Sequence, residues 1–362
     1  MGRGVQEALP LVAMLDAYGR TLKIATLAAQ RDVVIARVIR VDRGVYTVMC
    51  DDGSHATSIA GELKDAKDPV SRPTIGDWVV VDADHVVREV LPRSSVFLRG
   101  DSEKLQAQAV AANVDVVFVV QACEELNVRR LERELVLAHQ SGATPVVLLS
   151  KADQCEDIPR IVAKARQCAP GLAVIATSAV DGRGVADLSA YGAGGLTMAF
   201  IGASGAGKST LVNAMLGRDE QSTGAVREYD GRGRHTTSAR SLFALASGGV
   251  LIDTPGLRSI GMWRSDEGIA EAFRDIEELS SGCRFSDCSH DHEPHCAVRV
   301  AIEMGLIDVE RVENYRLLQA ELDLLDDEAE SRKRVVKQQQ RQATKAATPP
   351  PQYRDARGER RR

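Results

Sequence analysis

A glycine-rich segment more than halfway along the chain constrains the fold most strongly. The segment GASGAGKST fits the pattern G-x-x-x-x-G-K-[ST] in full, after the apolar run MAFI and before the helical pattern TLVNAML. Such a loop curls its backbone N–H groups around phosphate oxygens, and the helix N-terminus adds partial positive charge. The sequence therefore predicts an α/β sheet with a phosphate-binding loop. The predicted ligand-binding residues are Gly202, Ala203, Ser204, Gly205, Ala206, Gly207, Lys208, Ser209 and Thr210.

Two further segments complete the predicted phosphate site. Lys208 would contact the β- and γ-phosphates, and Ser209 would ligate Mg²⁺. In GVLIDTPG an apolar strand ends in Asp253, which would hold Mg²⁺ directly or through water, and the N–H of Gly256 would contact the γ-phosphate. The intervening loop offers Thr236 or Thr237 as the switch residue that ligates Mg²⁺, with Thr237 slightly favoured.

Hydrolysis requires a group that positions water. Ras-like proteins carry a glutamine just after this strand, whereas this chain has Leu257, so a low intrinsic rate and a stimulating partner are expected. His235, beside the switch threonines, is the titratable side chain placed to orient or activate water. The alternative is an ordinary surface-loop histidine.

Two other strand ends indicate which base is bound. In SKAD, Asp153 could accept hydrogen bonds from guanine, and the stem of Lys151 could lie along the base, while Ser150 stands where guanine-specific proteins carry asparagine. This change weakens the contact expected at the purine N7 edge. In the next loop, TSA, Ser178 and Ala179 would offer backbone N–H groups to guanine O6. Together the two motifs favour guanine over adenine.

The order of these motifs is unusual. The base motifs precede the phosphate-binding loop, whereas a conventional GTPase begins with that loop. Because packing in a doubly wound sheet depends on which strands are neighbours, the chain ends can move around it. The sequence therefore predicts a circularly permuted P-loop GTPase domain. Its last motif then leads straight into the C-terminal helices, so the nucleotide state could move them directly.

A Cys/His cluster follows the last motif. Cys283, Cys288, His290 and Cys296 have the spacing C-x4-C-x-H-x5-C, which predicts one structural Zn²⁺ with a closed tetrahedral shell. His292 and His295 are competing imidazoles, and free thiols in a loop are the alternative. The four other cysteines, Cys50, Cys123, Cys155 and Cys168, lie among apolar residues and are expected to pack as small hydrophobic side chains.

Composition and periodicity divide the chain into five parts. They are a lead-in over 1–30, a β-barrel of the oligonucleotide-binding (OB) type over 31–98, the permuted GTPase domain over 99–262, a helical zinc-binding domain over 263–328 and a basic tail over 329–362. The tail, with eleven Lys or Arg and two acidic residues from position 332 onward, is expected to be disordered. It is either an RNA-binding arm or a solvated tail. No apolar run suggests a membrane span or secretory signal, so the expected location is cytoplasmic.

These motifs together resemble the ribosome small-subunit-dependent GTPase A family, a group of circularly permuted ribosome-assembly GTPases. The similarity runs from about Val33 to Leu325 and includes GDWV, AANVDVVFVV, GASGAGKST, GRHTTS, DTPG and the Cys/His cluster. It implies an N-terminal OB-fold, a GTP-hydrolysing domain and a C-terminal zinc domain. It also implies a role in late maturation of the small (30S) ribosomal subunit, with GTP hydrolysis stimulated by the subunit and release of the protein in its GDP form. We expect a monomer whose partners are the subunit and its rRNA. The alternative is a non-catalytic, GTP-switched RNA-binding module.

Overall fold

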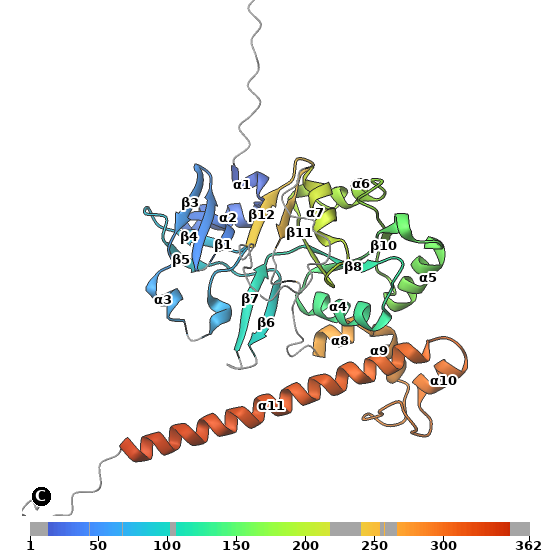
Figure 1. Cartoon of the computed structure of the whole chain (residues 1–362). Coiled ribbons are helices and arrows are strands. Elements are labelled where there is room, and N and C mark those ends of the chain that lie inside the picture. The colour runs from blue at the N-terminus through green and yellow to red at the C-terminus, as the bar shows by residue number, and fades with distance from the viewer. Residues whose placement is uncertain are drawn as a thin grey trace, which may run out of the picture.

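The structure is a computed structural model that describes residues 14–42, 44–66, 68–101, 106–217, 240–253, 257 and 266–347. An eleven-stranded mixed sheet runs through the main body of the molecule (Figure 1). Nine of its strands follow the order β10-β9-β8-β11-β13-β12-β1-β2-β3, and β4 and β5 branch from β1. The sheet has a parallel half, which contains the predicted nucleotide motifs, and an antiparallel N-terminal half.

The parallel half is formed by short apolar segments that are buried on both faces. Its strands are β8 (Val116–Ala122), β9 (Thr144–Ser150), β10 (Val174–Ala176), β11 (Thr197–Gly202) and β13 (Val250–Asp253), with the antiparallel β12 (Arg240–Ala244) beside β13. All five parallel strands lie within segments that the sequence predicted as buried strands. Continuous valine- and leucine-rich runs form such strands because helices cover both faces of a parallel sheet.

Helices from successive crossovers cover the two faces. These helices are α4 (Val128–Gln140), α5 (Ile158–Cys168), α6 (Val185–Ala190) and α7 (Lys208–Leu216), with the 3₁₀ turns η2 (Ala152–Gln154) and η3 (Ala193–Gly195) between them. One hydrophobic core contains residues of α4 and α5, and a second contains residues of α6 and α7. Asn127 and Asp157 start α4 and α5, because each side chain accepts the N–H three residues later. The result is the predicted doubly wound domain.

The N-terminal half, which the sequence predicted as a barrel, contains five strands. They are β1 (Val34–Asp42), β2 (Val45–Cys50), β3 (Gly53–Thr57), β4 (Trp78–Val81) and β5 (Val87–Val90), with α3 (Gly61–Lys64) and the 3₁₀ turn η1 (Pro69–Ser71) between β3 and β4. This half does not end at the predicted border. Strand β1 pairs with β12 of the GTPase half, and the hairpin β6 (Val96–Asp101) and β7 (Gln106–Ala112) crosses residue 98. The two halves therefore share one sheet through β1 and β12, while the predicted border at residue 98 falls inside a separate two-stranded sheet.

Arg37 joins the two halves from inside the protein. Helices α1 (Met14–Ala17) and α2 (Leu22–Arg31) precede β1, and Arg37 lies on β1 with 1% of its surface exposed. Its guanidinium donates to the backbone oxygens of Tyr18 and Asn113 and to Thr197 Oγ1 at 2.7 Å. Burial lowers the pKa of Arg37 to about 10, which still leaves the side chain charged at neutral pH. One cation thus fixes the lead-in helices and the first strand against β11.

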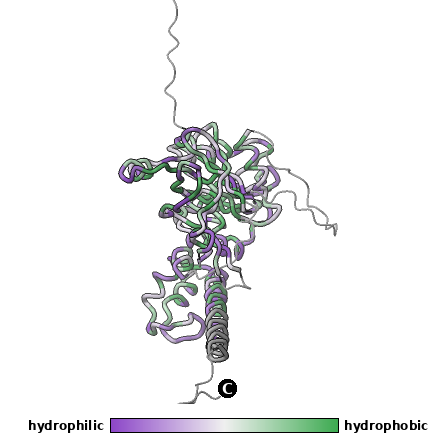
Figure 2. The backbone as a smooth tube through the Cα atoms, turned by 90° about the vertical axis from the view of Figure 1, so that its left-hand side faces the viewer, coloured by the Kyte–Doolittle hydropathy of each residue, from purple (hydrophilic) through white to green (hydrophobic). Residues whose placement is uncertain are grey.

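The C-terminal part is helical, as predicted, but its last helix is much longer than expected. Its helices are α8 (Asp266–Ala272), α9 (Arg274–Ser280), α10 (Ala297–Glu303) and α11 (Val309–Ala347). The sequence predicted a disordered tail from residue 329, whereas α11 continues to Ala347 and lies below the body in two views (Figures 1 and 2). Lysine, arginine, glutamine and alanine dominate the sequence of this extension, and all four have high helix propensity. Within the described residues no helix is both long and apolar enough to cross a membrane.

Arg311 connects α11 to the GTPase half. This residue, 4% exposed, donates to Glu132 Oε1 on α4 at 2.8 Å and to both carboxylate oxygens of Asp275 at 2.7 and 2.8 Å. Its remaining N–H groups donate to the backbone oxygens of Cys168 and Ala272. All five guanidinium donors are therefore used, and they fix the middle of α4 and the ends of α5, α8 and α9 to α11.

Replacing Arg311 with methionine should destabilise the protein strongly. The variant Arg311→Met leaves Glu132, 1% exposed, without its cation, and breaking a buried pair costs about 3–5 kcal/mol. Burial already raises the pKa of Glu132 to about 7, and loss of Arg311 raises it further. The pKa of Glu132 is lower in the unfolded chain than in the folded variant. The variant therefore keeps its stability at low pH and loses it as the pH rises through the pKa of folded Glu132. Urea unfolding should therefore show a larger deficit at about pH 8 than at about pH 6.

A second ion pair between the same two helices provides the control. Arg133 of α4 pairs with Glu321 of α11, and both side chains are more than a third exposed. Exposed pairs contribute at most about 1 kcal/mol, so Arg133→Met should have a small effect with little dependence on pH. Equal losses in the two variants would show that Arg311 has no special structural role.

Candidate functional site

The predicted nucleotide motifs meet at one edge of the parallel sheet. Ser150 ends β9, Gly202 ends β11, Asp253 ends β13, and Thr177 directly follows β10. The carboxyl ends of parallel strands point the same way, and ligands of open α/β sheets bind beyond this edge. The tertiary structure therefore places the base motifs beside the phosphate-binding loop, as the permuted order required.

The first glycine of the phosphate-binding loop leaves no room for a side chain. Gly202 has φ 141°, and a Cβ at this position would lie 2.4 Å from the backbone oxygen of Val120. Lys208, the first residue of α7, is 7% exposed, and its Nζ donates to the backbone oxygens of Gly202 at 2.7 Å and Ala203 at 2.5 Å. The ammonium group thus lies across the mouth of the loop, where a phosphate can replace these carbonyl partners.

A buried polar pair behind the loop was not predicted. Gln121, in the otherwise apolar strand β8, donates to Glu134 Oε2 on α4 at 2.7 Å. Burial raises the pKa of Glu134 to about 7, and the charge of Lys208 opposes this rise. The sequence contains one indication of this pair, the glutamine in the run VVFVVQA, because a polar residue inside a buried strand needs a hydrogen-bond partner. The carboxyl group of Glu134 therefore lies close enough to Lys208 for the two to interact electrostatically.

Ser150 connects the base motif to the phosphate-binding loop. The side chain is 1% exposed, and its hydroxyl contacts the backbone oxygens of Ala206 at 2.6 Å and Gln121 at 3.2 Å. Lys151 follows in the left-handed conformation with φ 54°, and Asp153 is exposed in the turn η2. The serine that replaces asparagine therefore keeps a direct bond to the loop that would hold the phosphates.

The second base loop is bonded to the first. Ala152 N donates to Thr177 O at 3.0 Å, which places the TSA segment beside SKAD. Ser178 is fully buried; its hydroxyl accepts from the N–H groups of Val180 and Asp181, and its own N–H donates to Arg183 O. Ser178 therefore shapes the turn, while Ala179 is the neighbouring residue that is partly exposed.

The catalytic assignments fall largely outside the described part of the chain. His235, Thr236, Thr237 and Gly256 lie outside the described residues, so they stay predictions. Asp253 is half-buried at the end of β13, opposite Ser241 of β12. Leu257 is 3% exposed and belongs to the core that also contains α8, α9 and α11 residues.

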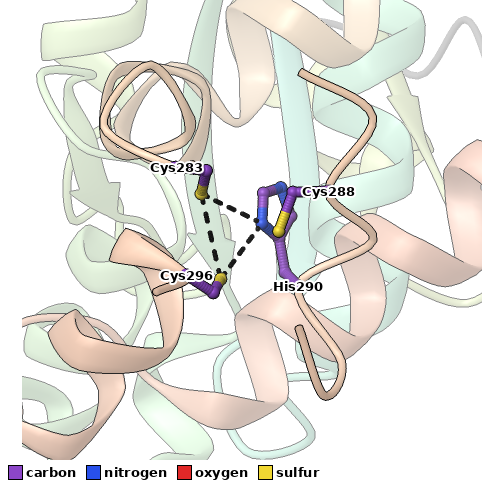
Figure 3. A group of neighbouring side chains, drawn as sticks. All are labelled: Cys283, Cys288, His290 and Cys296. Carbon is purple, nitrogen blue, oxygen red and sulfur yellow. Dashed lines mark hydrogen bonds between the residues drawn. The ribbon is translucent and has the colours of Figure 1, made fainter. Parts of the chain in front are cut away.

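The Cys/His cluster is assembled as predicted (Figure 3). Cys283 Sγ lies 3.7 Å and Cys296 Sγ 3.5 Å from His290 Nδ1, and the two sulfurs are 3.8 Å apart. A tetrahedral ion with S and N ligands at their usual bond lengths separates sulfur from nitrogen by about 3.6 Å and two sulfurs by about 3.8 Å. These four residues can therefore hold a metal ion in a closed shell.

Surrounding groups orient the cluster. The other ring nitrogen of His290 lies 3.0 Å from Ser280 Oγ on α9, an arrangement that fixes the ring with Nδ1 toward the sulfurs. Although burial opposes ionisation of Cys283, the N–H groups of Val298 and Ala297 lower the pKa of its thiol. His292 is paired with the adjacent Asp291 at the surface, and His295 is exposed, so His290 is the imidazole of the cluster.

The fold and this edge of the sheet define a circularly permuted P-loop GTPase. The RsgA GTPase family profile matches residues 90–263. The small ribosomal subunit biogenesis GTPases RsgA 2 of Vibrio parahaemolyticus and RsgA of Streptomyces avermitilis are 40% and 43% identical, over 81% and 79% of this chain and 80% and 79% of their own. The chain therefore belongs to the RsgA GTPase family, and it hydrolyses GTP.

Solved structures agree with this assignment. The crystal structure of YjeQ from Thermotoga maritima matches 80% of this chain and 98% of its own, with a TM-score of 0.61 and 28% identity. The crystal structure of YloQ, described as a circularly permuted GTPase, matches 80% of this chain and 95% of its own, with a TM-score of 0.58. At 23% identity this structure supports the fold alone. The predicted permutation is therefore confirmed.

Replacing Ser150 with alanine should weaken nucleotide binding. Ser150→Ala removes the bond to Ala206 O, and one lost hydrogen bond of about 1.4 kcal/mol corresponds to about a tenfold rise in the Kd for GTP. Ser189→Ala, whose hydroxyl bonds Val185 O within α6, is the matched control and should leave the Kd unchanged. Fluorescent-nucleotide titration measures both. An unchanged Kd in Ser150→Ala would mean that this bond does not support the loop.

Proposed function

We propose that the chain is a GTPase that acts in assembly of the small ribosomal subunit and is stimulated by that subunit. The observation that carries the proposal is the combination of a complete phosphate-binding loop with a buried Leu257 at the position where a water-positioning side chain is expected. Relatives named as small ribosomal subunit biogenesis GTPases support the choice of partner.

The nucleotide residues have distinct roles in this proposal. Asp153 accepts from the guanine base, Lys151 lies along it, and Ala179 offers a backbone N–H to O6, since Ser178 N already donates to Arg183. Lys208 exchanges its two carbonyl partners for phosphate oxygens. Ser209, Asp253 and the switch threonine, Thr237 or Thr236, are the residues that would hold Mg²⁺, which neutralises phosphate charge when bound.

His235 is the proposed water-positioning residue. An imidazole can accept a proton from water or orient it, whereas the buried aliphatic Leu257 can do neither. The subunit would supply contacts that help His235 to position water. This division of the site between two molecules would couple hydrolysis to the presence of a subunit.

The Cys₃His cluster would hold structural Zn²⁺. Three thiolates and one imidazole match the donors that zinc prefers, and they leave no open position for a substrate. The ion would fix the loop between α9 and α10, next to the core that contains Leu257. A movement that begins after Asp253 could thereby reach the zinc region through continuous packing.

Two regions are proposed to contact rRNA. The antiparallel strands β1–β5 match the strand count expected for an OB-type barrel, and folds of this type bind nucleic acid. The basic residues of the last part of α11 and beyond supply charge suited to phosphate. A monomer suffices for these contacts. The second candidate, an RNA-binding module switched by GTP whose turnover the subunit does not raise, is favoured by Leu257 alone.

Hydrolysis assays with isolated small subunits test the proposal. GTP turnover should be slow for the chain alone and at least about tenfold faster with the subunits, whereas ATP should not be hydrolysed, because Asp153 has no matching donors on adenine. Lys208→Ala should abolish tight GTP binding. Equal slow rates with and without subunits would favour the switched binding module instead.

A variant of the proposed water-positioning residue separates binding from catalysis. His235→Ala should keep the Kd for GTP and lower the stimulated rate by about 10²–10³-fold, since general acid–base and positioning groups contribute at this scale. His139→Ala, a half-buried histidine on α4, is the control. A normal stimulated rate in His235→Ala would make this residue an ordinary loop histidine.

Zinc content tests the metal assignment. Cys283→Ser should lose one equivalent of tightly bound zinc while the Kd for GTP stays within about twofold, because the cluster lies outside the nucleotide edge. Cys155→Ser, a half-buried cysteine outside the cluster, should keep its zinc. Undiminished zinc in Cys283→Ser would contradict the assignment.

A further inference from the structure

A second group of metal-binding side chains lies in the N-terminal half. Cys50, His55 and His85 each offer a ligand atom, and these atoms lie within 4.8 Å of one another. Cys50 Sγ is 3.9 Å from His85 Nδ1. Cys50 is 2% exposed and the two histidines are half-buried. From the sequence Cys50 is expected to pack as a small hydrophobic side chain, and no pattern indicates a role for either histidine.

The strand register explains part of this convergence. Val48 of β2 pairs with His55 of β3, and Cys50 pairs with Gly53 across the turn of the hairpin. Cross-strand partners share a face, and so do residues two apart, which makes Cys50 and His55 diagonal neighbours on one face. Their approach is therefore fixed by backbone pairing.

His85 reaches the same point from a second hairpin. It lies in the turn between β4 and β5 with φ 58°, and its N–H donates to Asp82 O at 2.9 Å. Its backbone oxygen accepts from Thr57 Oγ1 at the end of β3. A non-glycine residue rarely adopts this conformation, and here two bonds hold it. The turn therefore presents His85 to the β2–β3 hairpin.

The sulfur–nitrogen distance is close to those of the Cys₃His cluster, and one histidine has a polar partner on its other ring nitrogen. The sulfur–nitrogen separation of 3.9 Å compares with 3.5 and 3.7 Å there, and with about 3.6 Å for a tetrahedral ion. His55 Nε2 lies 2.9 Å from Asp52 Oδ1, which leaves Nδ1 for a ligand. A carboxylate behind a histidine is the usual arrangement at metal sites.

We propose that Cys50, His55 and His85 bind a second zinc ion through Sγ, Nδ1 and Nδ1, with water in the fourth position. One thiolate and two imidazoles select zinc over magnesium or calcium, which prefer oxygen. The two rings are stacked with centroids 3.7 Å apart and an angle of 11°. Because the nitrogen lone pairs lie in the ring planes, the rings have to tilt relative to each other for both nitrogens to face one ion. The ion ties the tip of the β2–β3 hairpin to the β4–β5 turn.

A reactive Cys–His pair is the competing interpretation. Burial and the carboxylates of Asp52 and Asp51 raise the pKa of the Cys50 thiol to about 11, the opposite of an activated nucleophile. Simple packing of a thiol beside stacked histidines is the other interpretation. Both predict one zinc ion per chain, whereas the proposal predicts two.

Metal content of the full-length chain provides the test. The reduced protein is stripped with a chelator, reloaded with Zn²⁺ and freed of excess metal before its zinc is measured. Wild type should hold two equivalents, Cys50→Ser and His85→Gln one each, Cys283→Ser one, and Cys50→Ser/Cys283→Ser none. Because three ligands hold less tightly than four, mild chelation should remove the N-terminal ion first.

Controls separate loss of metal from loss of fold. Cys123→Ser, a fully buried cysteine elsewhere, should keep two equivalents, and an unchanged Kd for GTP shows that each variant is folded. His85→Gln keeps the buried Cys50 intact if Cys50→Ser fails to fold. One equivalent in wild type, or two in both Cys50→Ser and His85→Gln, overturns the proposal.

Discussion

The guanidinium of Arg311 is the contact on which the relative position of the two main parts depends. Its five N–H groups are shared among Glu132, Asp275 and two backbone oxygens, so α11 meets four other helices at one buried point. Hydrogen bonds are directional, whereas apolar side chains can slide. The planar donor set of arginine therefore fixes an angle between elements as well as a distance. The Cys₃His cluster is built on the helices that this contact holds.

Arg37 has the corresponding role at the other border, with different chemistry. It donates mainly to backbone oxygens and to Thr197, and its ring partner is Trp78 at 5.0 Å. Carbonyl dipoles stabilise a cation without adding a second buried charge, which lowers the desolvation cost of the contact. Because β1 also pairs with β12, the N-terminal half is an extension of the GTPase sheet. Both flanking parts are thus attached rigidly to the strands around the nucleotide edge.

The circular permutation connects the nucleotide edge of the sheet directly to the C-terminal helices. In this chain β13 ends in Asp253 and leads toward α8, and Leu257 belongs to the same core as Ile269, Phe273 and Leu318. A change near the γ-phosphate therefore needs only a few residues to reach the helices that carry the Cys/His cluster. In the conventional motif order the chain after this strand would continue to the base motifs instead of the C-terminal helices. The proposed coupling between nucleotide state and the C-terminal helices depends on that continuity.

The sequence by itself determined the features that are local. Buried strands, the phosphate-binding loop, the permuted motif order and the four residues of the Cys/His cluster all follow from short patterns whose chemistry is read over a few positions. The tertiary structure decided the features that join distant residues. Arg311 meets Glu132 across 179 positions, Ser150 meets Ala206 across 56, and His85 meets Cys50 across 35. The length of α11 was also missed, because helix propensity without burial is a weak signal. Pairings of this kind depend on how the whole chain packs, and no local pattern contains that information.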